Sequence, residues 1–187
     1  MFEEPAPDCA LCPRLVAFRQ ENRAAFPGFH NAPVPAFGSL QARLLVVGLA
    51  PGLKGANQTG RPDDGLRLVD CRVTNAVRCV PPENKPTGAE ARNCRPFLLR
   101  EIGAMPQLRV ILCLGGLSHG AVLTTLGVRK SLYPFRHGAF HDVDGLTVAD
   151  SYHCSRYNTN TGRLTEAMFE EDFVGLRDRL AALPQKT

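Results

Sequence analysis

Long hydrophobic runs are missing from this 187-residue sequence. The longest, at 44–47 and 110–114, are far too short to cross a bilayer, which excludes a membrane-spanning helix. The first residues, Met-Phe-Glu-Glu-Pro, lack the basic start and apolar stretch of a secretory signal, so we expect a cytoplasmic protein. There is no internal repeat or low-complexity tract, and the 44% hydrophobic content predicts a single globular domain over residues 1–187.

Several catalytic signatures are also absent. The glycine-rich segment 48–62 has no Gly-Lys-Ser/Thr end, which excludes a phosphate-binding P-loop, and no Gly-x-Ser-x-Gly elbow occurs. No pair of nearby carboxylates has the arrangement that glycoside hydrolases use. The net charge of +4 permits a polyanionic partner but does not require one.

Cysteine is plentiful, but its seven copies are an odd number, and in a reducing cytosol this argues against a disulfide framework. Cys9 and Cys12 form a Cys-x-x-Cys pair, and Cys79 and Cys94 follow on either side of a proline-rich stretch. Four thiolates can hold a zinc ion or an iron–sulfur cluster. The alternative is a redox-active pair with two unrelated core cysteines, and spacing alone leaves both open. Two cysteines within apolar runs are expected to be small buried hydrophobes, Cys71 and Cys113.

Four apolar runs predict β-strands at 43–48, 68–75, 109–115 and 146–149. Two of them are almost continuously apolar, as strands buried on both faces of a parallel sheet are. Helical patterns lie between the strands: a capping box begins at Thr87, and Thr165 can cap a last helix. Pro96 must kink or split the first of these helices. The alternation predicts an α/β sandwich with a central, mostly parallel, four-stranded sheet.

Two unusual segments follow predicted strands, at the carboxyl ends where such sheets bind ligands. The first, 48–62, is rich in glycine, so its backbone can approach a ligand closely; the alternative is simple turn chemistry. The second, 151–165, contains His153, which can carry a proton or donate a hydrogen bond to a developing anion. The alternative is a solvated loop. His137 and His141 would ligate a metal only on one helical turn, and Gly138 between them favours a loop.

Taken together, these segments resemble the uracil-DNA glycosylase superfamily, and most of all its iron–sulfur type, family 5. The first segment resembles that family's first active-site motif, and the run from His153 to Thr165 resembles its second. The segment 74–86 also matches. The similarity extends from Cys9 to the last helix, and the paired cysteines fall where the family's four cluster ligands fall.

The resemblance implies a three-layer α/β/α sandwich, a [4Fe–4S] cluster held by Cys9, Cys12, Cys79 and Cys94, and hydrolysis of the N-glycosidic bond of deoxyuridine in DNA. Relatives of this type also accept other deaminated bases. The product would be free base and an abasic site. No lysine stands where it would form a Schiff base, so strand cleavage is not expected. The partner would be uracil-containing DNA, single- or double-stranded, bound by a monomer.

The resemblance also assigns roles to individual residues. His153 would donate to the uracil oxygen, and Asn75 would read the edge of the base. Ala50 and Asn57 of the first motif would belong to the catalytic site. The backbone that positions the base would be Gly48, Leu49, Ala50, Pro51 and Gly52. The DNA contacts would come from Ser155, Arg156, Asn158, Asn160, Arg163 and Leu164.

The sequence departs from the family pattern in two places. After Arg-Pro the family continues with an aromatic residue, a Thr-Gly-Asp turn and a helix, whereas here Asp63 follows Pro62 directly. Residues 49–67 would then have to form a crossover between parallel strands without a helical pattern. Either the protein has lost the segment or, as we expect, residues that belong between Pro62 and Asp63 are missing from the printed sequence. Asp63 and Asp64 are therefore not assigned as the water-activating acid. Cys154 stands where the family usually has proline.

Two other functions compete with the enzyme. A protein of this fold that lacks the acidic residue would bind uracil-containing or abasic DNA and turn over poorly. Without any nucleic acid, the four cysteines would make the chain a small iron–sulfur or zinc protein with a redox role.

Overall fold

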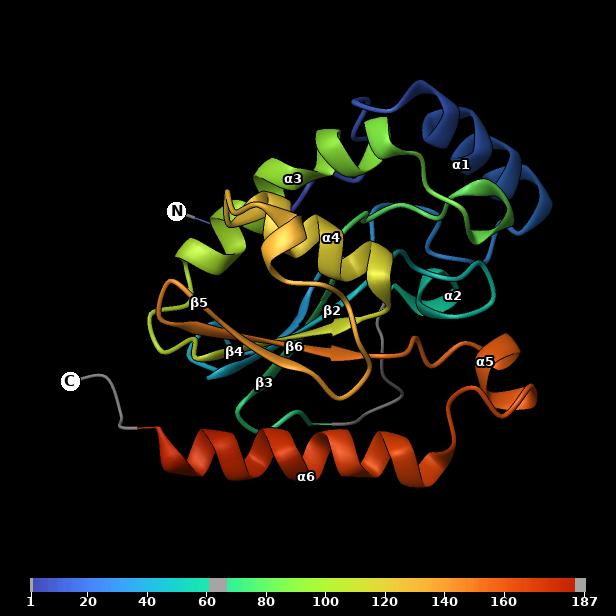
Figure 1. Cartoon of the computed structure of the whole chain (residues 1–187). Helices are drawn as coiled ribbons and strands as arrows, with labels where there is room; N and C mark the ends of the chain where they lie inside the picture. Colours follow the sequence, from blue (N-terminus) through green and yellow to red (C-terminus); the bar gives the residue numbers. More distant parts are fainter. Residues whose placement is uncertain (1, 61–66, 184–187) are drawn as a thin grey trace.

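The computed structural model describes residues 2–60 and 67–183. The predicted missing segment between Pro62 and Asp63 lies outside these residues. Helices and strands alternate along the chain (Figure 1): α1 Pro13–Ala25, β1 Phe37–Gly38, β2 Leu44–Gly48, α2 Ala56–Thr59, β3 Cys71–Asn75, α3 Gly88–Gly103, β4 Val110–Leu114, α4 Gly116–Thr125, β5 Phe140–Val143, β6 Leu146–Ser151, α5 Arg156–Asn160 and α6 Glu166–Ala182. Short 3₁₀ turns lie at Pro82–Asn84 and Lys130–Leu132. No helix in the described ranges is both long and apolar enough to cross a membrane.

The strands form one six-stranded sheet in the order β1-β3-β2-β4-β6-β5. The four predicted strands are its parallel centre, and the prediction of four strands was wrong because an antiparallel strand is added at each edge. β1 has only two residues and little periodicity to detect. β5 pairs with β6 through a hairpin whose turn residues, Asp144 and Gly145, both have positive φ. Asp-Gly is a strong hairpin signal that could have been recognised.

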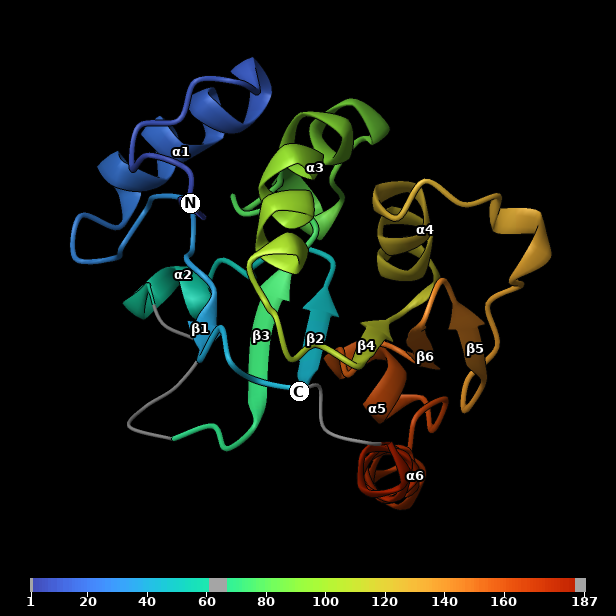
Figure 2. The ribbon, with the colours of Figure 1, turned by 90° about the vertical axis from the view of Figure 1, so that its left-hand side faces the viewer.

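Apolar side chains of the central strands are buried on both faces of the sheet. In β2, Leu45 and Val47 face the cluster under α3 and α4, whereas Leu44 and Val46 face the cluster under α6. Figure 1 shows α6 on one side of the sheet, and Figure 2 shows α1, α3 and α4 in a row on the other. The continuous apolar runs in the sequence therefore reflect burial from both sides.

Both predicted helix caps are present. The Thr87 hydroxyl accepts a hydrogen bond from the Glu90 backbone, and the Glu90 carboxylate accepts one from the Thr87 backbone, which completes a capping box. Thr165 accepts a hydrogen bond from the backbone of Met168 at the start of α6. Pro96 lies inside α3, which continues past it as one helix, so the predicted split does not occur.

A buried ionic cluster attaches α3 to β3. The carboxylate of Glu101 on α3 is fully buried and accepts hydrogen bonds from Arg72 (2.6 Å) and Thr74 (2.9 Å) of β3 and from Arg78. Glu4 from the N-terminal segment approaches both arginines, at 3.6 Å from Arg72 and 3.3 Å from Arg78. Every charge in this cluster therefore has an opposite charge in contact, which is what burial of ionised groups requires.

We expect Glu101→Gln to lower the free energy of unfolding by about 3–5 kcal/mol, because two buried guanidinium groups lose their buried carboxylate and keep only the more exposed Glu4. Urea denaturation measures this. Glu83→Gln, which removes an exposed carboxylate paired only with exposed Lys85, is the control and should leave the midpoint unchanged. Equal effects of the two substitutions would contradict a structural role for the buried cluster.

Candidate active site and cysteine cluster

The carboxyl ends of the four parallel strands meet at one edge of the sheet, and chain segments of unusual composition leave from there. Gly48 ends β2, Asn75 ends β3, Gly115 follows β4 and His153 follows β6. Because these strands are neighbours in the sheet, the four segments lie side by side. Both motifs singled out in the sequence are therefore brought to the same edge, where α/β sheets bind ligands.

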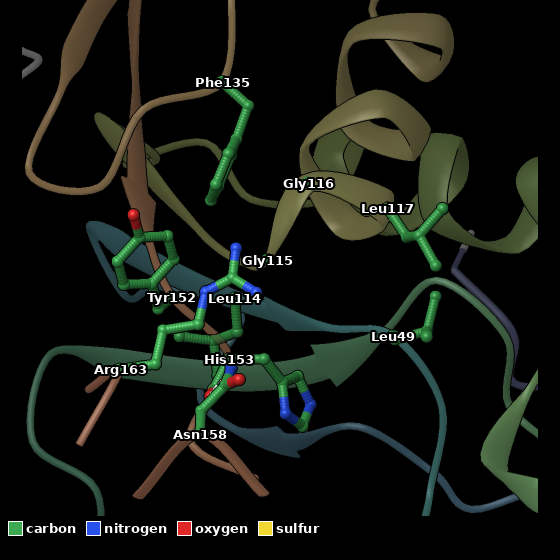
Figure 3. Close-up of a pocket in the computed structure, with 10 residues that line it drawn as sticks. All are labelled: Leu49, Leu114, Gly115, Gly116, Leu117, Phe135, Tyr152, His153, Asn158 and Arg163. Carbon is green, nitrogen blue, oxygen red and sulfur yellow. Dashed lines mark hydrogen bonds between the residues drawn. The ribbon is translucent and has the colours of Figure 1, made fainter. Parts of the chain in front are cut away.

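A pocket of about 230 Å³ opens at this edge (Figure 3). It contains an imidazole and a guanidinium among apolar and aromatic side chains and glycine backbone. Its lining residues are Leu49, Leu114, Gly115, Gly116, Leu117, Phe135, Tyr152, His153, Asn158 and Arg163. A few polar groups on a mostly apolar wall are typical of a site that binds a small organic molecule.

His153 is half-buried beside the loop that follows β4. A Cβ atom on Gly115 would lie 3.4 Å from the Cβ of His153, so the two backbones approach closely. The amide of Asn158 donates to the His153 carbonyl (2.8 Å), and Ser155 caps the short helix α5 that carries Asn158. Burial lowers the pKa of His153 below its ordinary value. The imidazole is therefore neutral at neutral pH and can donate one hydrogen bond into the pocket.

Tyr152 forms the centre of a stack on another wall of the pocket. Its ring lies parallel to that of His137, with centroids 4.6 Å apart, and the guanidinium of Arg163 lies 4.9 Å from the centroid of the Tyr152 ring. The backbone N–H of Tyr152 donates to Nδ1 of His137 (3.2 Å), which fixes the orientation of that ring. Figure 3 shows Arg163 beside Tyr152, with its guanidinium within the pocket.

A second histidine network lies behind the pocket, and sequence reasoning missed it. Nδ1 of His119 contacts the Asp150 carboxylate (2.7 Å), and its Nε2 contacts the carbonyl of Tyr133 (2.8 Å). Burial alone would lower the pKa of His119, but the hydrogen bond to Asp150, the Asp150 charge and the Tyr133 carbonyl outweigh it and raise the pKa. His141 also contacts Asp150, at 3.2 Å. Since both partners of His119 are acceptors, its ring carries two protons.

This network supports the pocket wall. The His119 ring packs edge-on against Phe135, which lines the pocket, and the backbone of Arg136 donates to Asp150. His119 and Asp150 are 31 residues apart, so no local spacing could have indicated the pair. His141 lies on a strand and not on a helical turn with His137, in agreement with the expectation from Gly138.

Asn75 lies against Gly48 on the neighbouring strand. The two residues are register partners, and a Cβ atom on Gly48 would come within 2.4 Å of the Asn75 side-chain oxygen. Glycine is therefore required at position 48 for Asn75 to keep its orientation. Asn75 does not line the pocket around His153, but it ends a strand at the same edge of the sheet.

Two predicted site residues are buried in this structure, Asn57 and Leu164, and the roles given to them stay predictions. Asn57 is 2% exposed and donates its amide to Asn31 at 2.9 Å, because α2 packs against the segment after α1. Leu164 is 1% exposed, and its backbone N–H donates to the carbonyl of Asn158 at 3.1 Å, which closes the loop.

The remaining predicted positions lie either in the loop after β2 or on the exposed segment that follows His153. Ala50, in the loop after β2, packs against the cysteine cluster. Pro51 is buried and Gly52 half-buried in the same loop. Arg156, Asn160 and Arg163 are exposed, as groups that contact DNA must be, and Cys154 is exposed beside His153. Their contacts with DNA stay predictions.

The four paired cysteines come together between α1, α3 and the loop after β3. Cys12, Cys79 and Cys94 are buried in one apolar cluster, and Cys9 lies close enough to act electrostatically on all three. Burial, followed by the proximity of Cys94, raises the pKa of Cys79 to about 12. Thiols this crowded and buried ionise only when a cation joins them.

The geometry of these thiols bears on what they can hold. Tetrahedral zinc, with Zn–S distances of about 2.3 Å, needs sulfur atoms about 3.8 Å apart. No three of the four cysteines form a group whose sulfurs all lie within 4.8 Å of one another. N–H groups also point at sulfur: the Asn93 amide lies 3.5 Å from Sγ of Cys12, and the Arg78 backbone donates to Cys94.

Comparison with known proteins identifies the family. The model of the Uracil DNA glycosylase superfamily matches residues 63–177. The chain belongs to the uracil-DNA glycosylase superfamily. The type-5 uracil-DNA glycosylase of Thermus thermophilus is 42% identical over 97% of this chain and 98% of its own length. That of Mycobacterium leprae is 38% identical over 88% of each chain. A type-4 enzyme of Pyrobaculum aerophilum is 32% identical over 54% of this chain and 58% of its own. The resemblance inferred from the motifs is confirmed.

We expect Gly48→Ala in this glycosylase-family protein to displace Asn75, because the added methyl group overlaps the Asn75 oxygen. The free energy of unfolding should fall by about 1–3 kcal/mol, the cost of overpacking. The Asn75 side-chain amide signals in a ¹H–¹⁵N NMR spectrum should shift. Gly52→Ala is the matched control, since nothing lies within 4 Å of its Cβ position, and it should move neither readout. Unchanged Asn75 signals in Gly48→Ala would contradict the contact.

Proposed function

We propose that this protein hydrolyses the bond between uracil and deoxyribose in DNA and leaves an abasic site. The observation that carries the proposal is a neutral, half-buried His153 that lines a pocket at the carboxyl edge of the sheet, in a chain of this superfamily. Type-5 uracil-DNA glycosylases align with it at 37–42% identity over 84–97% of its length. A base in a duplex must first be flipped out of the stack to enter such a pocket.

The proposed role of His153 follows from the charge that develops. As the N-glycosidic bond breaks, the sugar becomes cationic and uracil leaves as an anion whose negative charge reaches its carbonyl oxygens. A neutral imidazole donates a hydrogen bond to such an oxygen without having to lose a proton first. One preorganised donor of this kind lowers the barrier by about 3–4 kcal/mol. The bond from Asn158 to the His153 carbonyl supports this preorganisation.

Asn75 is proposed to read the edge of the base, because its amide offers one donor and one acceptor, as the imide of uracil does. β3 and β6 are separated by two strands, and three strand spacings amount to about 14 Å. A flat ring placed over Gly48, Leu49 and Gly115 would fill much of that gap between Asn75 and His153.

The rim of the pocket fits a DNA backbone. Arg156, Asn160 and Arg163 are exposed beside it, and within the described ranges neither arginine has a carboxylate partner. Such groups suit phosphate and sugar contacts. The pocket lining contains no lysine, which favours hydrolysis by water over a Schiff-base route that would cut the strand.

Cys9, Cys12, Cys79 and Cys94 are proposed to hold a [4Fe–4S] cluster. Their sulfurs are spread too widely for a single zinc ion, and N–H donors lie at sulfur as they do around iron–sulfur clusters. When bound, the cluster supplies a structural link between the N-terminal segment and α3. Ala50 packs on this cysteine cluster, so the loop after β2 would be supported by it.

We expect His153→Ala to reduce kcat for uracil release by about 100- to 1000-fold, because it removes one preorganised donor, and to leave the Kd for DNA nearly unchanged. Release is measured by alkali-dependent cleavage of a labelled single-stranded oligonucleotide with one uracil.

The wild-type rate should persist as pH falls through 6.5 and decline only at the lowered pKa of His153. A rate that rises on acidification would mean that imidazolium is the active form.

His137→Ala serves as the control for that substitution, since His137 stacks on Tyr152 and does not line the pocket. It should affect the rate far less. A His153→Ala protein that still releases uracil at the wild-type rate would overturn the proposed role.

Purified wild-type protein should be brown, with absorbance at about 400 nm and bound iron, because four thiolates of this spacing suit a cluster. Cys79→Ser should lose both signals, since it removes one ligand. Cys113→Ser, at a buried cysteine outside the set, should retain them. Stoichiometric zinc in place of iron would overturn the cluster assignment.

A second function, DNA binding with weak turnover, is favoured by a specific observation. The 215 positions aligned with the Thermus protein include 97% of this chain, so about thirty of them have no residue here. The family match begins at residue 63, and an apolar groove of about 560 Å³ lies between β3 and α6, beside the β2–β3 crossover. This supports the inference that a crossover segment is missing after Pro62. Binding of uracil-containing DNA without release of uracil would establish the second function.

A further inference from the structure

Arg19 on α1 is a buried cation whose bonding is incomplete. Its side chain is only 7% exposed, and Nη2 donates to the backbone carbonyl of Cys9 at 3.1 Å. Nε and Nη1 are buried and have no hydrogen-bond partner within the described ranges. No carboxylate among these residues pairs with Arg19 either, unlike the neighbouring Arg14 and Arg23.

An arginine in this state is unfavourable in the protein alone. A buried guanidinium has lost its hydration, and each buried N–H group without an acceptor adds a further cost. Natural interiors contain few such groups, and a bound water or ion is one of the explanations for those that occur. The acceptor must be negative or strongly polar, and it must lie where Nε and Nη1 can reach it.

The surroundings of Arg19 indicate which acceptor this is. Arg19 and Cys79 line the same small cavity, and the Arg19 charge acts on the Cys79 thiol. The carbonyl that Nη2 already contacts belongs to Cys9, a second member of the cysteine set. Two other cysteines of the set, Cys12 and Cys94, have N–H donors of their own. Arg19 is therefore placed as the donor on the Cys79 side.

We propose that Arg19 is the counterion and hydrogen-bond donor of the iron–sulfur cluster, and that its Nε–H and Nη1–H serve the side of the cluster that Cys79 would hold. The inference rests on the proposed cluster. Four thiolates leave such a cluster with a net negative charge, and a buried cation beside it stabilises both the bound cluster and its reduced form. The positive charge that is costly in the empty protein is neutralised when the cluster is bound.

A different acceptor would be a water molecule in the same cavity, whose volume of about 10 Å³ is at the lower limit for one water. The two acceptors differ in their consequences. With a cluster partner, Arg19 destabilises the empty protein and stabilises the loaded one. With a water partner, or with a purely structural role, its removal would affect both forms alike.

The test compares Arg19→Met with wild type in both forms. The substitution keeps most of the volume and removes the charge. The loaded variant should lose its absorbance at about 400 nm some tenfold faster than wild type during exposure to oxygen and chelator, in line with other substitutions around metal sites. Its cluster reduction potential should shift to more negative values. The iron-free variant should melt at the same temperature as iron-free wild type or higher.

Arg23→Met, one turn along α1, is the matched control, because that guanidinium already pairs with Asp8 and with the Asn31 carbonyl. It should leave cluster lifetime and potential unchanged. Arg19→Lys, which keeps the charge but not the planar donor group, should restore the potential in part and provides a second variant if Arg19→Met folds poorly.

One result would overturn the role of Arg19 alone, and another would overturn the cluster assignment as well. Equal cluster lifetime and potential in iron-loaded wild type and Arg19→Met would show that Arg19 does not act on the cluster, while the cluster itself stands. Wild-type protein prepared without oxygen that binds no iron would overturn the cluster assignment, and the role of Arg19 with it.

Discussion

The rest of this structure depends on one fully buried carboxylate, that of Glu101. It joins α3 to β3 through Arg72 and Thr74, and it holds Arg78 at the point where the chain leaves the strand. Asn75 lies between these partners at the end of β3, and Cys79 follows Arg78 directly. The backbone of Arg78 in turn donates to Cys94 on α3. Because one ionic cluster fixes both α3 and β3, the carboxyl end of the sheet and the four paired cysteines keep fixed positions relative to each other.

Two histidines near the pocket illustrate how the environment decides protonation. His119 faces a carboxylate and a carbonyl, whose effects outweigh burial and raise its pKa, and these two contacts fix its ring in place. His153 is buried without an acidic partner, and its pKa is lowered. One histidine thus supports the pocket wall behind Phe135, and the other lines the pocket itself. Pairs of titratable groups whose pKa values are shifted in opposite directions recur in catalytic sites.

Positive charge is distributed unevenly over the protein. The arginines that hold elements together are paired with carboxylates, as Arg14 is with Glu90 and Arg43 with Asp70. The arginines at the mouth of the pocket, Arg156 and Arg163, have no such partner in the described part of the chain, so their charge is available to phosphate. A net charge of +4 alone could not reveal this, since it counts both groups alike.

The sequence by itself determined the central strands, both helix caps, the two motif loops and the cysteine set. These depend on periodicity, capping and spacing among residues a few positions apart, or on motifs that keep their order along the chain. Only the tertiary structure decided that Asn57 and Leu164 are buried, that Asp150 charges His119, and that Arg19 lacks acceptors beside Cys79. Burial and pKa depend on contacts between segments tens of residues apart, and no local pattern in the chain records which distant side chains will meet.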